Sequence, residues 1–403
     1  MSTPIIAEEV RGTIPAGSTG PKSKPIVVAV PKEMTPGEQR VATVPEVVQK
    51  LTKSGYEVRI EHDAGTGAFY PDDLFIAAGA KIAFTRTDLL NDAQIMLCVQ
   101  PPTVAEVDQL AEGSIVIGFM NPANNLGTVV KMRDRKITAF ALELVPRITR
   151  AQSMDALSSQ ATAGGYVAAI LGAGNCPKFL PMLTTAAGTI RPATVLILGA
   201  GVAGLMAIAT SKRLGAIVEA YDVRRAAGEQ VRSLGAKFLE LAINAEGQGG
   251  YARELTPEEK EKEQQMVSAA VARADIVITT AAIPGRRAPV LITRETVATM
   301  RPGAVIIDMA AESGGNCELT RPGKTIREHG IMIIGPQNLP ARVPFHSSQM
   351  YAKNLHSFLT LLTERDGAIV KEFTDEILVA SLLVHAGVVR HKPTHDLLNG
   401  GKP

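Results

Sequence analysis

The stretch TVLILGAGVAGLMAIATSKRLGAIVEAYDVR (194–224) is the part of the chain that leaves the fewest folds open. An apolar run leads into the turn Gly199-Ala-Gly201-Val-Ala-Gly204, and a helical stretch and a second apolar run follow. In such a turn the first glycine permits the sharp bend, the second lets a pyrophosphate approach the backbone, and the third lets helix and strand pack closely. The stretch therefore predicts a strand–helix–strand unit that binds a dinucleotide, with a glycine-rich packing turn as the alternative.

Asp222 ends the second apolar run, where a carboxylate accepts hydrogen bonds from a ribose and repels the 2′-phosphate of NADP. Arg224 and Arg225 lie nearby and offer positive charge to such a phosphate, or they form the solvated start of the next helix. We expect NAD(H) as the cofactor. The expected cofactor-binding residues in this unit are Gly199, Gly201, Val202, Gly204, Asp222, Val223 and Arg224.

Apolar runs separated by helical stretches occupy both halves of the chain. They include IVVAV (26–30), IMLCV (95–99), SIVIGF (114–119), ADIVITTA (274–281) and GAVIIDMA (303–310). Runs of continuous apolar character indicate parallel strands that are covered on both faces. The sequence therefore predicts an α/β fold with two Rossmann-like, doubly wound parallel-sheet domains separated by a cleft.

The expected domain boundaries follow from the order of these patterns. Residues 25–150 would form the first domain together with 350–403, because the helical pattern of Ser347 to Leu362 is expected to return to it. The NAD-binding Rossmann domain would span 160–348, and a long helix beginning near residue 151 would link the two. Residues 1–24 are rich in Gly, Pro, Ser and Thr, which is typical of a disordered leader.

Composition excludes several classes of partner. The net charge is only +2, so no electrostatic argument supports nucleic acid as a ligand. The three cysteines, Cys98, Cys176 and Cys317, lack metal-binding spacing, and we expect a reducing cytosol and no metal site. The longest apolar candidate for a membrane span, Ile377 to Val389, is interrupted by His385 and is too short to cross a bilayer.

A polar cluster, PRITRAQSMDALSS (146–159), precedes the glycine turn and contains no histidine, cysteine or lysine. A dehydrogenase acting on an alcohol or amine needs a group that takes or gives a proton as hydride moves. Hydride passing from one nicotinamide ring to another needs only orientation and exclusion of water. The cluster therefore favours direct transfer between nucleotides, with a capped polar hinge between the domains as the alternative. Its candidate catalytic residues are Arg147, Gln152, Asp155 and Ser158, of which Gln152 and Asp155 would also contact the cofactor.

Two further segments have both a functional and a structural interpretation. The glycine-rich loop NAEGQGGYARELTP (244–257) carries Tyr251, which would close over a bound nucleotide or lie in an exposed connector. Charged residues follow the first strand, where α/β folds often bind ligands, but an ion-paired loop explains them equally well. These residues are Lys32, Glu33, Glu38 and Arg40.

Together these motifs resemble the NAD(H)-binding component, domain I or the alpha subunit, of proton-translocating, Re/Si-specific NAD(P) transhydrogenases. The resemblance extends over about residues 25–393, and PRITRAQSMD is its most specific motif. It implies that hydride passes directly between NADH on this chain and NADP⁺ on a partner subunit, coupled to proton translocation across a membrane. Arg147, Gln152, Asp155 and Ser158 match the loop that positions nicotinamide, Tyr251 matches the mobile loop, and Asp222 matches the adenosine-ribose contact.

The same resemblance implies partners and a location. These are a membrane-embedded transhydrogenase subunit, a beta subunit that binds NADP(H) and a second copy of this chain, with no nucleic acid. The chain would then be cytoplasmic and peripheral, held on the inner face of the cytoplasmic membrane by its partner subunits.

Two other functions remain open. Alanine dehydrogenases share the PKE…R opening, but that family places a lysine and a histidine near where Gln100 and Asn121 stand here. An amide side chain neither takes up nor releases a proton near neutral pH, so it cannot act as a general acid or base. Arg40 alone does not make an amino-acid oxidase. A non-catalytic NAD-sensing subunit is the third hypothesis, since hydride transfer between nucleotides would need no catalytic side chain in the proposed site.

Overall fold

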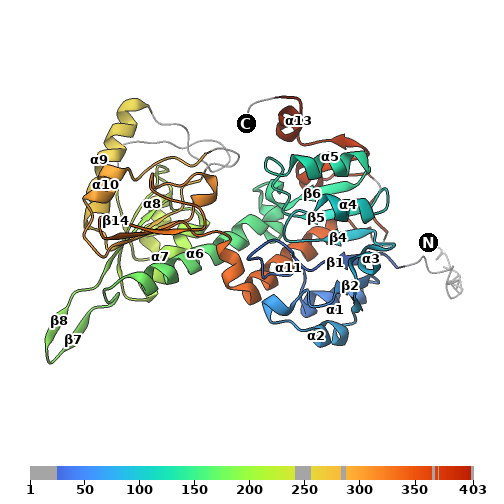
Figure 1. Cartoon of the computed structure of the whole chain (residues 1–403), viewed down its shortest axis with the longest axis horizontal. Coiled ribbons are helices and arrows are strands. Elements are labelled where there is room, and N and C mark those ends of the chain that lie inside the picture. Colours follow the sequence, from blue (N-terminus) through green and yellow to red (C-terminus); the bar gives the residue numbers. More distant parts are fainter. Residues whose placement is uncertain (1–24, 241–255, 283–286, 365–367, 371, 401–403) are drawn as a thin grey trace, which may run out of the picture.

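The computed structural model describes residues 25–240, 256–282, 287–364, 368–370 and 372–400 (Figure 1). The expected leader at 1–24 and Tyr251 lie outside the described residues. Two β-sheets lie on either side of two long helices, α6 (Ala156–Asn175) and α11 (Pro344–Leu361). The predicted α/β fold with two Rossmann-like sheets is confirmed.

The first sheet has the strand order β17-β16-β6-β5-β4-β1-β2-β3. Its six parallel strands are β1 (Val27–Val30), β2 (Glu57–Glu61), β3 (Lys81–Ala83), β4 (Ile95–Leu97), β5 (Ile115–Gly118) and β6 (Thr138–Ala141). Two strands from the end of the chain, β16 (Leu382–His385) and β17 (Val388–Val389), add to β6 in antiparallel fashion. The helices between them are α1 (Pro45–Lys53), α2 (Asp72–Ala77), α3 (Arg86–Leu90), α4 (Val104–Gln109) and α5 (Leu126–Asp134), with α12 (Glu376–Ser381) and α13 (Lys392–Leu398) near the C-terminus.

The second sheet has the order β11-β10-β9-β12-β13-β15-β14. Its strands are β9 (Thr194–Leu198), β10 (Ile217–Tyr221), β11 (Lys237–Phe238), β12 (Ile276–Thr279), β13 (Val305–Asp308) and β15 (Ile331–Ile334), all parallel, and the antiparallel β14 (Thr325–Glu328). Its helices are α7 (Val202–Arg213), α8 (Ala227–Ser233), α9 (Pro257–Arg273) and α10 (Arg294–Ala298). The parallel strands of both sheets therefore follow the doubly wound order 3-2-1-4-5-6, which reverses beside β1 and beside β9.

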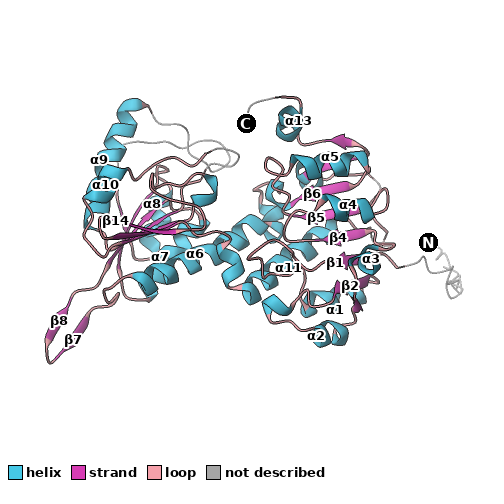
Figure 2. Ribbon diagram, viewed as in Figure 1, coloured by secondary structure: helices cyan, strands magenta, loops and turns pink. Residues whose placement is uncertain are grey.

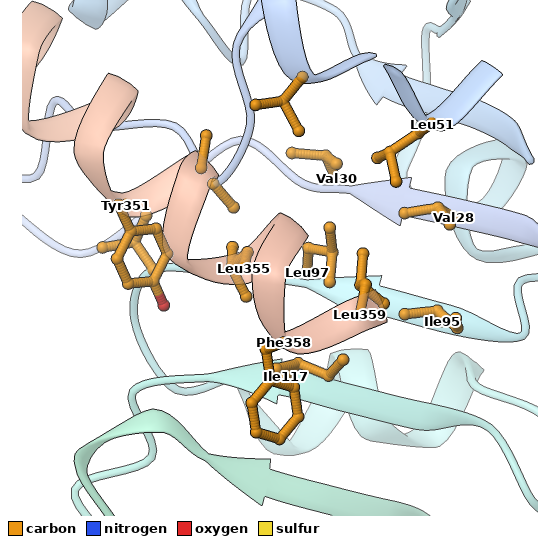
Figure 3. Close-up of a cluster of buried hydrophobic side chains, with 14 of the residues drawn as sticks. Val28, Val30, Leu51, Ile95, Leu97, Ile117, Tyr351, Leu355, Phe358 and Leu359 are labelled. Carbon is orange, nitrogen blue, oxygen red and sulfur yellow. The ribbon is translucent and has the colours of Figure 1, made fainter. Parts of the chain in front are cut away.

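Each sheet is covered on both faces, and successive side chains of its strands point to opposite faces, so neighbouring residues of a strand are both buried. In the first sheet, Val28 and Val30 of β1 face α11, whereas Val27 and Ala29 face the other layer. Figure 3 shows Leu355 of α11 among the side chains of this core. In the second sheet, α6 and α7 pack on one face and α9 on the other (Figure 2). The continuous apolar runs of the sequence are explained by this two-sided burial.

The linking helix begins later than the sequence pattern indicated. Residues Thr149–Met154 form a 3-10 turn, and α6 starts only at Ala156, because Asp155 caps the helix by accepting the backbone N–H of Ser158 at 2.8 Å. The helix ends at Asn175. It passes close to the start of α7, since a Cβ at Gly165 would lie 2.1 Å from the Ala203 carbonyl oxygen.

Candidate functional site

The glycine turn has the geometry of a pyrophosphate cradle. Gly199 has a φ of +102°, and a Cβ at Gly204 would lie only 1.9 Å from the Gly199 carbonyl oxygen. A Cβ at Gly201, by contrast, would meet nothing within 4 Å, so this backbone position is open to a ligand. The helix α7 begins directly after it at Val202 and presents its positive N-terminal end there. The turn joins β9 to α7 at the point where the strand order reverses, which is where doubly wound sheets bind ligands.

Asp222 follows β10 and is tied to the same turn. Its Oδ2 accepts the backbone N–H of Ala200 at 2.8 Å, and its Oδ1 accepts the backbone N–H of Arg224 at 2.8 Å. The Arg224 side chain adds bonds from Nε at 2.9 Å and Nη2 at 2.8 Å. All four acceptor positions of the carboxylate are therefore used. The charge by which Asp222 was expected to repel a 2′-phosphate is therefore compensated, because Arg224 forms an ion pair with Asp222.

The polar cluster divides into residues with structural partners and one without. Asp155 accepts both the backbone N–H of Ser158 and its hydroxyl, the latter at 2.6 Å, so the expected helix cap is present. Gln152 is exposed, and within the described residues its side chain makes no hydrogen bond, ion pair or ring contact. Arg147 is exposed on the same segment. Gln152 thus offers an amide for a ligand, whereas Asp155 and Ser158 already hold the start of α6.

Hydrogen bonds and an ion pair from other elements hold the polar cluster in place. The residues that provide them were not singled out from the sequence. Asn354 of α11 donates from Nδ2 to the Ser153 carbonyl at 2.9 Å and accepts from the Ser159 hydroxyl at 2.7 Å. Arg150 forms an ion pair with Asp375 at 2.6 Å. The sequence contains one signal for the role of Asn354. In SSQMYAKN (347–354) it is a polar residue at a position of the helical pattern where an apolar residue is expected.

The carboxyl edge of the first sheet carries the charged residues that follow β1. Glu38 pairs with Arg40 at 2.6 Å, so the ion-paired loop exists. Burial opposes ionisation of Glu38, but the hydrogen bonds and charge of Arg40 lower its pKa to about 2. Glu33 accepts the backbone N–H of Val99 at 2.5 Å, and burial raises its pKa from 4.5 to about 7. A cavity of about 190 Å³ lies beside these residues and is lined by Lys32, Glu33, Gln100 and Thr103 among others.

Gln100 and Asn121 lie at the carboxyl ends of β4 and β5. The Gln100 amide donates to Glu38 at 2.8 Å, and the Asn121 side chain accepts from Asn124 at 3.0 Å. Asn121 also donates its backbone N–H to Glu143, a buried carboxyl group whose pKa is raised by burial. Both positions are therefore occupied by amides that are held in hydrogen bonds.

One group of potential metal ligands comes together in the described portion of the chain. The ligand atoms of His62, Asp63 and Asp72 lie within 4.8 Å of one another, on the surface and away from the glycine turn. His62 Nδ1 is already hydrogen-bonded to Asp72 at 2.6 Å. Sequence spacing gave no signal for this group because His62 and Asp63 follow β2, whereas Asp72 is the first residue of α2.

Two doubly wound sheets of equal strand order, one with a pyrophosphate-binding turn, define a two-domain α/β protein of the nicotinamide-nucleotide-binding class. Models of the alanine dehydrogenase/PNT N-terminal and C-terminal domains match residues 29–163 and 168–392, respectively. The chain belongs to the alanine dehydrogenase/PNT family, and the resemblance inferred from its motifs is confirmed.

Relatives from both branches of the family match along most of the chain. The first polypeptide of the NAD(P) transhydrogenase alpha subunit of Rhodospirillum rubrum is 48% identical over 374 residues, which cover 90% of this chain and 97% of that protein. The crystal structure of transhydrogenase from Sinorhizobium meliloti has a TM-score of 0.83 at 43% identity and covers 90% of this chain and 99% of its own. Alanine dehydrogenase of Mycobacterium tuberculosis is 32% identical over 324 residues, 79% of this chain and 82% of that protein. Among the described residues, no helix combines the length and apolar character needed to cross a bilayer.

Proposed function

We propose that the chain is the NAD(H)-binding alpha subunit of a proton-translocating, Re/Si-specific NAD(P) transhydrogenase. The observation that carries the proposal is the exposed Gln152, whose side chain has no partner among the described residues, beside a capped helix start in a segment without histidine, cysteine or lysine. Bound NADH supplies the hydride, and NADP⁺ on a partner subunit accepts it. The residues of this chain bind and orient the nucleotide and exclude water.

The arrangement of α6 supports this division of roles. The helix touches the start of α7 where Gly165 meets Ala203, next to the pyrophosphate cradle. Ser158 lies on the same helix roughly 10 Å away along its axis, at 1.5 Å per residue. A nucleotide whose pyrophosphate sits on the glycine turn would therefore extend its nicotinamide toward Gln152, Asp155 and Ser158. Arg147 would contribute positive charge near the ring, and Asp222 would hold the adenosine ribose once Arg224 shifts.

The chain would also form a homodimer. In the described structure the two strands β7 (Leu183–Thr185) and β8 (Gly188–Ile190) pair only with each other and extend away from the second sheet (Figure 2). An isolated two-stranded hairpin is marginal in water, so contact with a second molecule would stabilise it. The exposed apolar side chains at its base support this: Phe179, Met182, Ile190 and Ile217 line a cavity of about 1200 Å³.

The other partners are a beta subunit that holds NADP(H) and a membrane-embedded subunit, which would keep this chain on the inner face of the cytoplasmic membrane. Coupling to proton translocation would belong to the assembled complex.

The decisive experiment mixes the purified chain with the NADP(H)-binding component of a transhydrogenase. Reduction of an acetylpyridine analogue of NAD by NADPH is then followed by absorbance. We expect transfer only when both components are present. Tight NADH binding without any transfer would instead support the NAD-sensing subunit, and NADH formation from NAD and alanine would support the amino-acid oxidoreductase.

A further inference from the structure

Arg40 lies in the loop that follows β1 and makes four hydrogen bonds with its guanidinium group. Nε donates to Glu38 Oε1 at 2.8 Å and Nη2 donates to Glu38 Oε2 at 2.6 Å, which makes a bidentate ion pair. Nη1 donates to Gln160 Oε1 at 2.8 Å, and Nη2 also donates to Asn338 Oδ1 at 3.0 Å. One side chain therefore contacts its own loop, helix α6 and the segment that follows β15.

The partners of Arg40 are themselves cross-linked. Glu38 Oε2 accepts from Asn338 Nδ2 at 2.9 Å and from Gln100 Nε2 at 2.8 Å. Gln160 Nε2 donates to the Ser347 carbonyl at the start of α11, at 3.1 Å. The Arg40 network, defined as Glu38, Arg40, Gln100, Gln160 and Asn338, thus joins the carboxyl edges of the two sheets to both connecting helices.

The network is closed to water at its centre. Arg40 is 4% exposed, and the Glu38 side chain is fully buried. Charge-assisted hydrogen bonds are strong and directional when they are not screened by solvent. A planar guanidinium presents its donors in a fixed fork, whereas an ammonium group is a single point charge on a flexible stem. The relative orientation of the loop after β1, helix α6 and the segment after β15 therefore depends on an arginine at position 40.

We propose that Arg40 is a positioning residue for hydride transfer, which fixes the nicotinamide-binding end of α6 against the first sheet. Gln160 lies two residues after Ser158 on the same helix, so the hold of Arg40 on Gln160 is transmitted directly to the polar cluster. If the Arg40–Glu38 ion pair served only stability, Arg40 would not need its hydrogen bonds to Gln160 on α6 and to Asn338. An arginine kept for binding a substrate anion would not have Glu38 across two of its donor groups. This inference rests on the proposed function, because it concerns the same site.

The test compares two variants of the network with one control. Arg40→Lys keeps the positive charge opposite Glu38 but loses the planar guanidinium that donates to Glu38, Gln160 and Asn338 at the same time. Asn338→Gly keeps the backbone, because Asn338 has a φ of +45° that glycine adopts freely, but removes the link to the second sheet. Arg59→Lys is the control, since Arg59 pairs with Glu57 within the first sheet alone, at 2.8 Å.

Single-turnover hydride transfer, NADH affinity and melting temperature are measured for each protein. A displacement of about 1 Å between reacting atoms costs roughly a hundredfold in rate. We expect Arg40→Lys and Asn338→Gly to lower the transfer rate at least tenfold while the dissociation constant for NADH changes by less than threefold. The double variant should lose no more than the worse single one, because both act through one network. Arg59→Lys should transfer at the normal rate.

A structural readout separates this inference from the proposed function. Spin labels at Lys53→Cys on α1 and Arg213→Cys on α7, in a Cys176→Ser background, report the distance between the two sheets. Arg40→Lys should broaden that distribution even if no transfer partner works, whereas an inactive parent protein would count against the proposed function alone. Unchanged transfer with a lower melting temperature, or an unchanged distance distribution, would overturn the positioning role.

Discussion

Asn354 and Ser159 are joined by a hydrogen bond of 2.7 Å between the α11 carboxamide and the α6 hydroxyl. The same carboxamide donates to the Ser153 carbonyl, so one buried side chain holds both ends of the turn that opens α6. Because α11 also supplies Tyr351 and Phe358 to the core of the first sheet, the polar cluster is anchored to that core. The site residues are thus supported by bonds to α11 as well as by those within their own segment.

Replacing Asn354 should therefore affect both stability and the site. Asn354→Ala removes two hydrogen bonds, each worth about 0.5–1.5 kcal/mol, although the Ser159 hydroxyl keeps the Ala156 carbonyl as a partner. We expect a lower free energy of unfolding in urea and slower hydride transfer. Asn175→Ala, an exposed asparagine that bonds only within α6, is the control and should change stability by less than about 0.5 kcal/mol. Equal stability of the two variants would contradict the anchoring role.

Gln152→Asn should separate orientation from binding. Shortening this exposed amide removes its reach to the nicotinamide while the pyrophosphate and adenosine contacts persist. We expect single-turnover transfer to fall at least tenfold and NADH binding to weaken by no more than about 1.4 kcal/mol, one decade in dissociation constant. The melting temperature should not change, because Gln152 has no structural partner in the described chain. Gln49→Asn, another exposed glutamine, serves as control, and a loss of stability without loss of transfer would favour a purely structural hinge.

Cofactor choice should depend on Arg224 as well as Asp222. We expect the chain to bind NADH more tightly than NADPH. Because Arg224 neutralises Asp222, Arg224→Ala should expose the carboxylate to a 2′-phosphate and weaken NADPH binding about tenfold further relative to NADH, about 1.4 kcal/mol. Calorimetric titration of both nucleotides measures this, with the exposed neighbour Arg225→Ala as control. Equal affinities of the parent protein for the two nucleotides would refute the preference.

The chain alone, given NAD and alanine, should produce no NADH. Gln100 and Asn121 offer no proton acceptor, and Arg40 is occupied by Glu38. Absorbance at the NADH maximum, with an alanine dehydrogenase as positive control, checks this outcome. Sustained alanine oxidation would replace the transhydrogenase assignment with the amino-acid oxidoreductase.

Glu33 should make stability fall as the pH rises from about 4.5 to 7. Burial raises its pKa to about 7 in the folded state, so across this window the folded chain retains a proton that the unfolded chain has lost. The contribution to stability is complete below 4.5, declines by at most about 1.4 kcal/mol per pH unit, and is gone above 7. Glu38 does not act in this window, because its pKa lies near 2. Urea unfolding of the parent and Glu33→Gln should give a difference that slopes only between these pH values, and a constant difference would contradict the buried proton.

Several features of the fold and site could be read from the sequence because they depend on neighbouring residues. The glycine turn, the continuous apolar strands and the absence of histidine, cysteine and lysine from 146–159 are local patterns, and the α/β class follows from the first two. Even the late start of α6 reflects a local competition, in which the Asp155 cap prevailed over helical periodicity. Short strands such as β3, with three residues and only one buried, carry too little pattern to be recognised.

The interactions that give the site its geometry come from the docking of the two sheets. Arg40 bonds to Gln160 and Asn338 across 120 and 298 positions of sequence, and Asn354 reaches Ser153 across 201. No periodicity or turn preference links residues so far apart, since hydrophobic pattern fixes which face is buried but not which polar groups meet when the faces close. The sequence alone thus determined the class of fold, the nucleotide turn and the chemistry absent from the cluster. Tertiary packing decided that Arg40 meets Gln160 and Asn338, that Asn354 bonds to Ser153, and that Gln152 is left exposed.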